Sequence, residues 1–126
     1  MRTRIVVIED SPASRDFIVR LLRTEGHEVV AACDGETGVL AVARERPDVV
    51  LCDIQLPGID GFEVLRALRG DPATREIPVC AVTAFALGDM HELARSAGFA
   101  GFLAKPVSAA TLLPALRAVM ARRNAS

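Results

Sequence analysis

Short apolar runs alternate along the chain with segments in which apolar residues recur every three or four positions. The runs are typical of strands buried on both faces of a sheet, and the wider spacing is typical of amphipathic helices. The runs predict strands at residues 5–9, 27–32, 48–53, 77–83 and 98–104. The periodic segments predict helices from the Ser11-Pro12 cap to Gly26, from Gly35 to about Glu45, around Phe62 to Leu68, from Gly88 to Ala97, and from Ser108 to about Arg122.

This order of elements predicts a (βα)5 domain. Strands that alternate with helices form a parallel sheet covered on both faces, and right-handed crossovers leave few strand orders. One of them is the flavodoxin-like order 2-1-3-4-5, in which strands 1 and 3 are neighbours at the switch point. We expect one domain over residues 1–126, with a core at about 3–121 and a frayed polar tail at 122–126.

The composition is that of a globular protein with a large core. The chain is 51% hydrophobic and 25% charged, with a net charge of −1, so nothing in it favours binding to nucleic acid or to an anionic membrane. The apolar run after Arg4 is too short for a signal peptide or a membrane span. Cys33, Cys52 and Cys80 lack a C-x-x-C spacing and predict reduced, buried thiols in a cytoplasmic protein.

Polar residues follow four of the predicted strands. Glu9-Asp10, Asp53, Thr83 and Lys105 each stand where an apolar run ends. The carboxyl ends of parallel strands meet at one edge of the sheet, so we expect these side chains to share a pocket. Three carboxylates with waters suit Mg²⁺, and without a cation they would repel one another. An alternative for Glu9 and Asp10 is that they only cap the following helix.

Asp53 is the candidate nucleophile of this pocket. A carboxylate can attack a phosphoryl group and carry it as an acyl phosphate. Lys105 is the only lysine of the chain, and its compact ammonium can reach a phosphoryl oxygen where the planar fork of an arginine would not fit. Thr83 can donate a hydroxyl hydrogen bond to the same group, although taken alone it is an ordinary threonine at a strand end.

Together these motifs resemble the receiver domain of two-component response regulators (CheY-like) over essentially the whole chain. The resemblance rests on their order and spacing: Glu9-Asp10, the segment Asp53-Ile54-Gln55-Leu56-Pro57-Gly58 with Gly61, Thr83-Ala84, and Lys105-Pro106. The segments at residues 53–57 and 81–86 are also similar to stand-alone receivers of the DivK type.

The resemblance implies a role for each matching residue. Asp53 would accept a phosphoryl group from a histidine kinase or histidine phosphotransferase in a Mg²⁺-dependent reaction. Asp10, Asp53 and the backbone carbonyl of Gln55 would be metal ligands, and Glu9 would help to bind the metal directly or through water. Lys105 would pair with the phosphoryl group, and its bond to Pro106 would be cis. Thr83 and Phe102 would be the switch pair that passes the signal to a downstream protein.

Three other functions are weighed against this one. A phosphatase with an aspartyl-phosphate intermediate would want an acid two residues after the nucleophile, where this chain has Gln55. A flavin-binding protein would want a hydroxyl- and glycine-rich loop after the first strand, where this chain has Glu9-Asp10-Ser11-Pro12. The chain is alternatively a receiver fragment of a hybrid kinase or of a DNA-binding regulator. We expect a signalling domain rather than an enzyme, with at most self-phosphorylation and autodephosphorylation.

Overall fold

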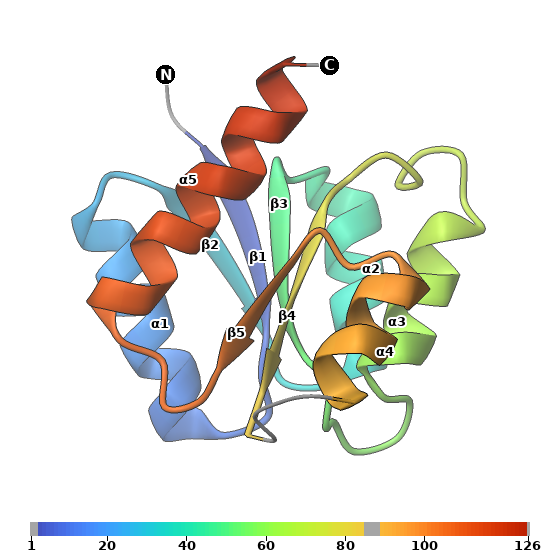
Figure 1. Cartoon of the computed structure of the whole chain (residues 1–126), viewed down its shortest axis with the longest axis horizontal. Coiled ribbons are helices and arrows are strands. Elements are labelled where there is room, and N and C mark those ends of the chain that lie inside the picture. The colour runs from blue at the N-terminus through green and yellow to red at the C-terminus, as the bar shows by residue number, and fades with distance from the viewer. Residues whose placement is uncertain (1–2, 85–88, 126) are drawn as a thin grey trace.

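The computed structural model describes residues 3–84 and 89–125, in which strands and helices alternate strictly (Figure 1). The strands are β1 (Arg4–Ile8), β2 (Glu28–Ala32), β3 (Val49–Asp53), β4 (Val79–Thr83) and β5 (Gly101–Ala104). The helices are α1 (Pro12–Thr24), α2 (Gly35–Glu45), α3 (Gly61–Arg69), α4 (Asp89–Ala97) and α5 (Ala109–Ala125).

The strands form one parallel sheet in the order β2-β1-β3-β4-β5, which confirms the predicted flavodoxin-like topology. β1 and β3 are neighbours, and Ile8 pairs with Cys52. The residues that follow β1 and those that end β3 therefore lie side by side. This register puts Glu9 and Asp53 at the same edge of the sheet.

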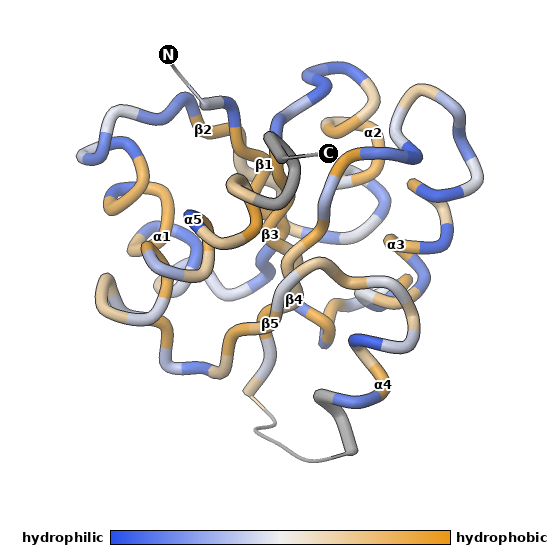
Figure 2. Tube along the Cα trace, turned by 45° about the horizontal axis from the view of Figure 1, so that its top comes forward, coloured by the Kyte–Doolittle hydropathy of each residue, from blue (hydrophilic) through white to orange (hydrophobic). Residues whose placement is uncertain are grey.

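Helices cover both faces of the sheet. In Figure 1, α1 and α5 lie on one side, and α2, α3 and α4 lie on the other. Each face has its own apolar core, because successive strand residues point to opposite faces. β1 and β3 are buried on both faces and are mostly hydrophobic along the trace in Figure 2, as the continuous apolar runs predicted.

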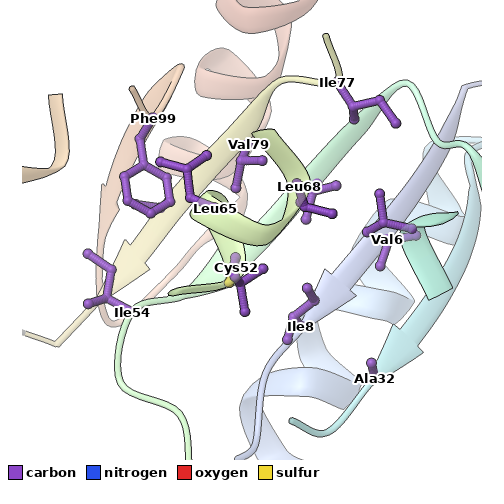
Figure 3. Close-up of a cluster of buried hydrophobic side chains, with 14 of the residues drawn as sticks. Val6, Ile8, Ala32, Cys52, Ile54, Leu65, Leu68, Ile77, Val79 and Phe99 are labelled. Atoms are coloured by element: carbon purple, nitrogen blue, oxygen red, sulfur yellow. The ribbon is translucent and has the colours of Figure 1, made fainter. Parts of the chain in front are cut away.

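The core under α2, α3 and α4 reaches to the edge that carries the polar residues. Figure 3 shows Ile8 of β1 and Cys52 of β3 facing Leu65 and Leu68 of α3. Phe99 completes this core by packing edge-on against the ring of Phe62, with 5.6 Å between the ring centroids. This rigid, close-packed core fixes the end of β3, where Asp53 lies.

The starts of three helices are fixed by side-chain caps. Ser11 caps α1 and is followed by Pro12, as predicted, and Asp34 caps α2. Asp60 and Glu63 form a reciprocal capping box at the start of α3. These caps fix the loops that connect β1, β2 and β3 to the helices that follow them.

Two features of the helices differ from what the sequence pattern alone suggests. Phe17 shares the helical spacing of the α1 core residues, yet 47% of its surface is exposed, because the apolar stripe of α1 is wider than its contact with the sheet. α5 continues to Ala125 rather than fraying after Arg122, because residues 117–125 contain no glycine or proline that would end a helix. The predicted first residue of α4, Gly88, lies outside the described residues.

The cysteine prediction holds for two of three residues. Cys52 and Cys80 are buried free thiols in β3 and β4. Cys33 is exposed, because it follows the last residue of the edge strand β2. No helix within the described part of the chain is long and apolar enough to cross a membrane.

Candidate phosphoryl-acceptor and metal site

Four predicted site residues meet at the carboxyl edge of the sheet. Glu9 follows β1, Asp53 ends β3, Thr83 ends β4 and Lys105 follows β5. Lys105 is held there by its backbone N–H, which donates to the carbonyl of Thr83 at 2.8 Å. Glu9 is held in the same way by its N–H bond to the carbonyl of Ala32 at 3.0 Å. Each side chain thus starts from backbone that continues the sheet.

The centre of the site is a buried ion triad of Glu9, Lys105 and Asp53. Lys105 Nζ lies 2.6 Å from Glu9 Oε1 and 2.7 Å from Asp53 Oδ2. Glu9 is 2% exposed and Asp53 is 3% exposed, whereas 20% of the Lys105 side chain is exposed. One ammonium therefore lies between two carboxylates that water hardly reaches.

The remaining carboxylate oxygens of the triad accept backbone hydrogen bonds. Glu9 Oε2 accepts the N–H of Ser11 at 3.0 Å, and Asp53 Oδ1 accepts the N–H of Gln55 at 2.9 Å. Charge-assisted bonds of this kind fix the direction of a carboxylate. The Gln55 side chain is exposed, so its backbone is the part of the residue that contacts the site.

Burial and charge act against each other on Lys105. Burial lowers the pKa of its ammonium, but the hydrogen bonds to Asp53 and Glu9 and the charges of both carboxylates raise it, and the net effect is a raised pKa. Lys105 therefore stays protonated at neutral pH. Burial, with the charge of Asp53, raises the pKa of the neighbouring Cys52 thiol, whose Sγ lies 3.3 Å from the Asp53 carbonyl oxygen.

Asp10 adds a third carboxylate. One oxygen atom each of Glu9, Asp10 and Asp53 lie within 4.8 Å of one another, and Asp10 is exposed while the other two are buried. Three hard oxygen ligands at one open edge fit a hydrated Mg²⁺ ion. The net charge of the cluster with Lys105 is −2, so a divalent cation would neutralise it.

The loop after Asp53 can reach the site because Gly61 has no side chain. A Cβ atom at Gly61 would lie 2.6 Å from Ile54 Cα and 2.7 Å from the Asp53 carbonyl oxygen. Gly58 has a φ of +76°, a conformation that favours glycine. Both glycines belong to the predicted segment after Asp53, and they let α3 begin directly under the end of β3.

Thr83 and Phe102 lie on the same face of the sheet. Phe102 pairs with Ala81, and Thr83 lies two residues after Ala81 on the same strand. Thr83 is fully buried and Phe102 is half-buried against the core under α2 to α4. A change at Thr83 therefore has a short path to the surface at Phe102.

Three further features surround the site. The Lys105-Pro106 bond is cis, as the resemblance implied. Phe17, together with Ile18, Pro106 and Val107, lines a hollow of about 460 Å³ beside Lys105. Arg15 Nη1 donates to the backbone carbonyls of Glu9 at 3.0 Å and Asp10 at 3.5 Å. No sequence pattern predicted Arg15, because many arginines of the chain share its helical surroundings.

Fold and site together define a doubly wound α/β domain with an acidic pocket and one lysine at the switch point of its sheet. Residues 5–117 match the family model of the response regulator receiver domain. The chain belongs to this family of two-component signalling domains. The resemblance identified from the motifs is thereby confirmed.

Individual relatives agree with this assignment. The chain is 38% identical to the protein PilH of Pseudomonas aeruginosa, with 94% of this chain and 98% of PilH covered. It is 31% identical to the polar-differentiation response regulator DivK of Brucella anthropi, with 95% and 98% covered. It is also 39% identical to the response regulator PleD of Caulobacter vibrioides, where the match covers 94% of this chain but 26% of PleD. The chain thus spans about a quarter of the length of PleD.

One solved relative contains the expected metal. The receiver domain of the sensor histidine kinase PA1611 from Pseudomonas aeruginosa was solved with a magnesium ion coordinated in its active-site cleft. Its TM-score to this chain is 0.83 at 32% identity, with both chains fully covered. Receiver domains bind Mg²⁺ in an acidic site, interact with histidine kinases and downstream targets, and serve in signalling rather than as enzymes of the usual kind.

Proposed function

We propose that this receiver accepts a phosphoryl group on Asp53 from a histidine kinase or histidine phosphotransferase. The observation that carries the proposal is the ion triad: Lys105 Nζ lies 2.7 Å from Asp53 Oδ2 and 2.6 Å from Glu9 Oε1. A purely structural triad would need neither a third carboxylate nor an opening to solvent, and this site has both in Asp10.

In the proposed reaction, a carboxylate oxygen of Asp53 attacks the phosphorus of the phosphohistidine. The O–P bond forms, the P–N bond breaks, and the imidazole leaves with the electron pair and takes up a proton. Lys105 exchanges its bond to Asp53 for one to a phosphoryl oxygen and stabilises the charge of the transferring group. The N–H of Gln55 keeps the other Asp53 oxygen in place throughout.

Glu9, Asp10, Asp53 and the backbone carbonyl of Gln55 would hold Mg²⁺. The cluster fits the ion, because it offers hard oxygen atoms within 4.8 Å of one another and carries excess negative charge. When bound, the ion would neutralise charge on the phosphoryl oxygens and would help to orient them.

Phosphorylation would bias an existing conformational equilibrium. The phosphoryl group offers an acceptor to the Thr83 hydroxyl, and movement of Thr83 opens space that the Phe102 ring can fill. The surface that responds would be made of α4, β5 at Phe102 and α5, and a downstream protein would bind to it. Backbone NMR with Mg²⁺ and beryllofluoride, a mimic of the acyl phosphate, tests this switch: shifts confined to the neighbourhood of Asp53 would contradict it.

The setting of the receiver belongs to the same proposal. We propose a cytoplasmic signalling module that binds proteins rather than nucleic acid or membrane. PilH and DivK are nearly covered by this chain, whereas PleD extends far beyond it, so both a stand-alone receiver and a receiver in a longer regulator or hybrid kinase are compatible. A phosphatase that acts on other substrates is disfavoured, since the amide of Gln55 is no general acid.

The decisive experiment is phosphoryl incorporation by Asp53→Asn. With acetyl phosphate and Mg²⁺, the unaltered protein should gain one phosphoryl group by intact mass, and the variant should gain none. Asp16→Asn is the matched control, because Asp16 is an exposed aspartate of α1. Undiminished incorporation in Asp53→Asn, with a circular dichroism spectrum unchanged, would overturn the assignment of Asp53.

A further inference from the structure

Arg15 is the basic residue of α1 that lies closest to the acidic site in sequence, and it makes no ion pair among the described residues. Its Nη1 donates to the carbonyl oxygen of Glu9 at 3.0 Å and to that of Asp10 at 3.5 Å. Both acceptors are backbone atoms of Glu9 and Asp10, which supply two of the three carboxylates of the pocket. The residue is half-buried.

The start of a helix is by itself an unfavourable place for a cation. Arg15 is the fourth residue of α1, near the positive end of the helix dipole, where acidic residues are preferred. The first turn of α1 holds no acidic residue that could offset it. The bonds to the two carbonyls and the neighbouring acidic cluster offset this effect of the helix dipole.

The two carbonyls fix the peptide planes on both sides of Asp10. Glu9 is also held by its own N–H bond, by the N–H of Ser11 and by Lys105. The carbonyl of Asp10 accepts a hydrogen bond from Arg15, and the carboxylate of Asp10 is exposed. The direction of the Asp10 side chain consequently depends on Arg15 more than the direction of Glu9 does.

We propose that Arg15 is a positioning residue for the metal site: through the carbonyls of Glu9 and Asp10 it orients the Asp10 carboxylate toward the cation shared with Asp53. This role rests on the proposed function of the pocket and adds a residue to it. Arg15 would contact neither the metal nor the phosphoryl group.

Charge and positioning predict opposite effects of removing Arg15. If only its charge mattered, Arg15→Ala would bind Mg²⁺ more tightly, because a cation beside the site is lost. If Arg15 positions Asp10, the same variant binds Mg²⁺ more weakly, and loss of an outer partner of a metal ligand commonly costs about tenfold in affinity. The sign of the change in Mg²⁺ affinity therefore distinguishes the charge effect from the positioning effect.

The experiment measures Mg²⁺ affinity by isothermal titration calorimetry at a temperature where circular dichroism shows every variant folded. Arg15→Ala should weaken Mg²⁺ binding about tenfold. Arg15→Lys, which keeps the charge and one donor, should lie between Arg15→Ala and the unaltered protein. Arg20→Ala is the matched control on the exposed side of α1 and should leave the affinity unchanged.

A second measurement tests whether Arg15→Ala merely disturbs the structure of the site. The rate of phosphoryl uptake from acetyl phosphate by Arg15→Ala should recover when Mg²⁺ is raised to saturation, because Asp53 and Lys105 are intact. Unchanged or tighter Mg²⁺ binding in Arg15→Ala would overturn the proposal, as would a raised KM for acetyl phosphate at saturating Mg²⁺. Failure of the unaltered protein to take up phosphoryl would instead contradict the proposed function, and the calorimetric comparison would still test Arg15.

Discussion

The buried triad at the sheet edge and the ion pairs on the helix surfaces use the same chemistry in different surroundings. In the triad, Lys105 lies between two carboxylates that are almost fully buried. On the surface, Arg44 pairs with Glu45 at 2.9 Å, and 66% of the Arg44 side chain and 26% of the Glu45 side chain are exposed. The distances are similar, but the surface partners contact water already, whereas the two carboxylates of the triad would stay buried if the pair were broken.

This difference decides what each pair contributes. Exposed pairs gain little, because water and salt already stabilise separated charges. A buried pair also gains little over an apolar replacement of both partners, but removal of one partner leaves a charge that water cannot reach. The triad therefore adds little to the free energy of unfolding. The cost of burying its charges is consistent with a site that binds a cation and a phosphoryl group.

The largest expected effect comes from removal of the ammonium. Lys105→Met leaves Glu9 and Asp53 facing each other without a cation and should destabilise the fold by about 3 kcal/mol. Urea unfolding followed by circular dichroism in the absence of Mg²⁺ measures it. Lys105→Arg keeps the charge and should restore most of the stability, yet it should impair phosphoryl uptake because the planar fork misfits. A loss under 1 kcal/mol in Lys105→Met would show that water screens the triad like a surface pair.

The same variant tests how the free energy of unfolding depends on alkaline pH. The pKa of Lys105 is raised above its ordinary value of 10.5, so its contribution is complete below pH 10.5 and is lost as pH rises through the raised folded value. Lys105 is the only lysine and the chain has no tyrosine, so few other groups titrate there. The stability difference between the unaltered protein and Lys105→Met should therefore shrink only above that pH.

Asp10 gives an effect of opposite sign and smaller size. Asp10→Ala removes one of three neighbouring negative charges and should raise the stability without metal by about 1 kcal/mol. The same change should weaken Mg²⁺ binding severely, so added Mg²⁺ should stabilise the unaltered protein more than the variant. Thermal unfolding with and without Mg²⁺ measures both. A drop in metal-free stability would support the alternative that Asp10 mainly interacts with the positive end of α1.

The sequence predicted the site because its members are strand ends. The burial of Asp53 and its nearness to Lys105 follow from parallel strands that end at one edge, and this needs no knowledge of side-chain rotamers. The orientation of Arg15 toward two carbonyls depends on such rotamers, so the periodicity of the sequence does not predict it. Phe17 shares the spacing of the α1 core residues but is exposed, and spacing alone does not say where a helix loses contact with the sheet. Cys33 was assigned to the interior because an apolar neighbourhood does not reveal that β2 is ending.

The smallest expected effect comes from the surface pair of Arg44. Arg44→Ala breaks its bond to Glu45 in the last turn of α2, and should change the stability by less than about 0.5 kcal/mol. Alanine keeps the helix, and Glu45 remains in contact with water, so no charge is left buried. Urea unfolding at low and high NaCl should show the small difference vanish with salt, whereas most of the loss in Lys105→Met should persist, because buried charges are screened less. A salt-independent loss above 1 kcal/mol for Arg44→Ala would mean that exposure does not separate the two kinds of ion pair in this protein.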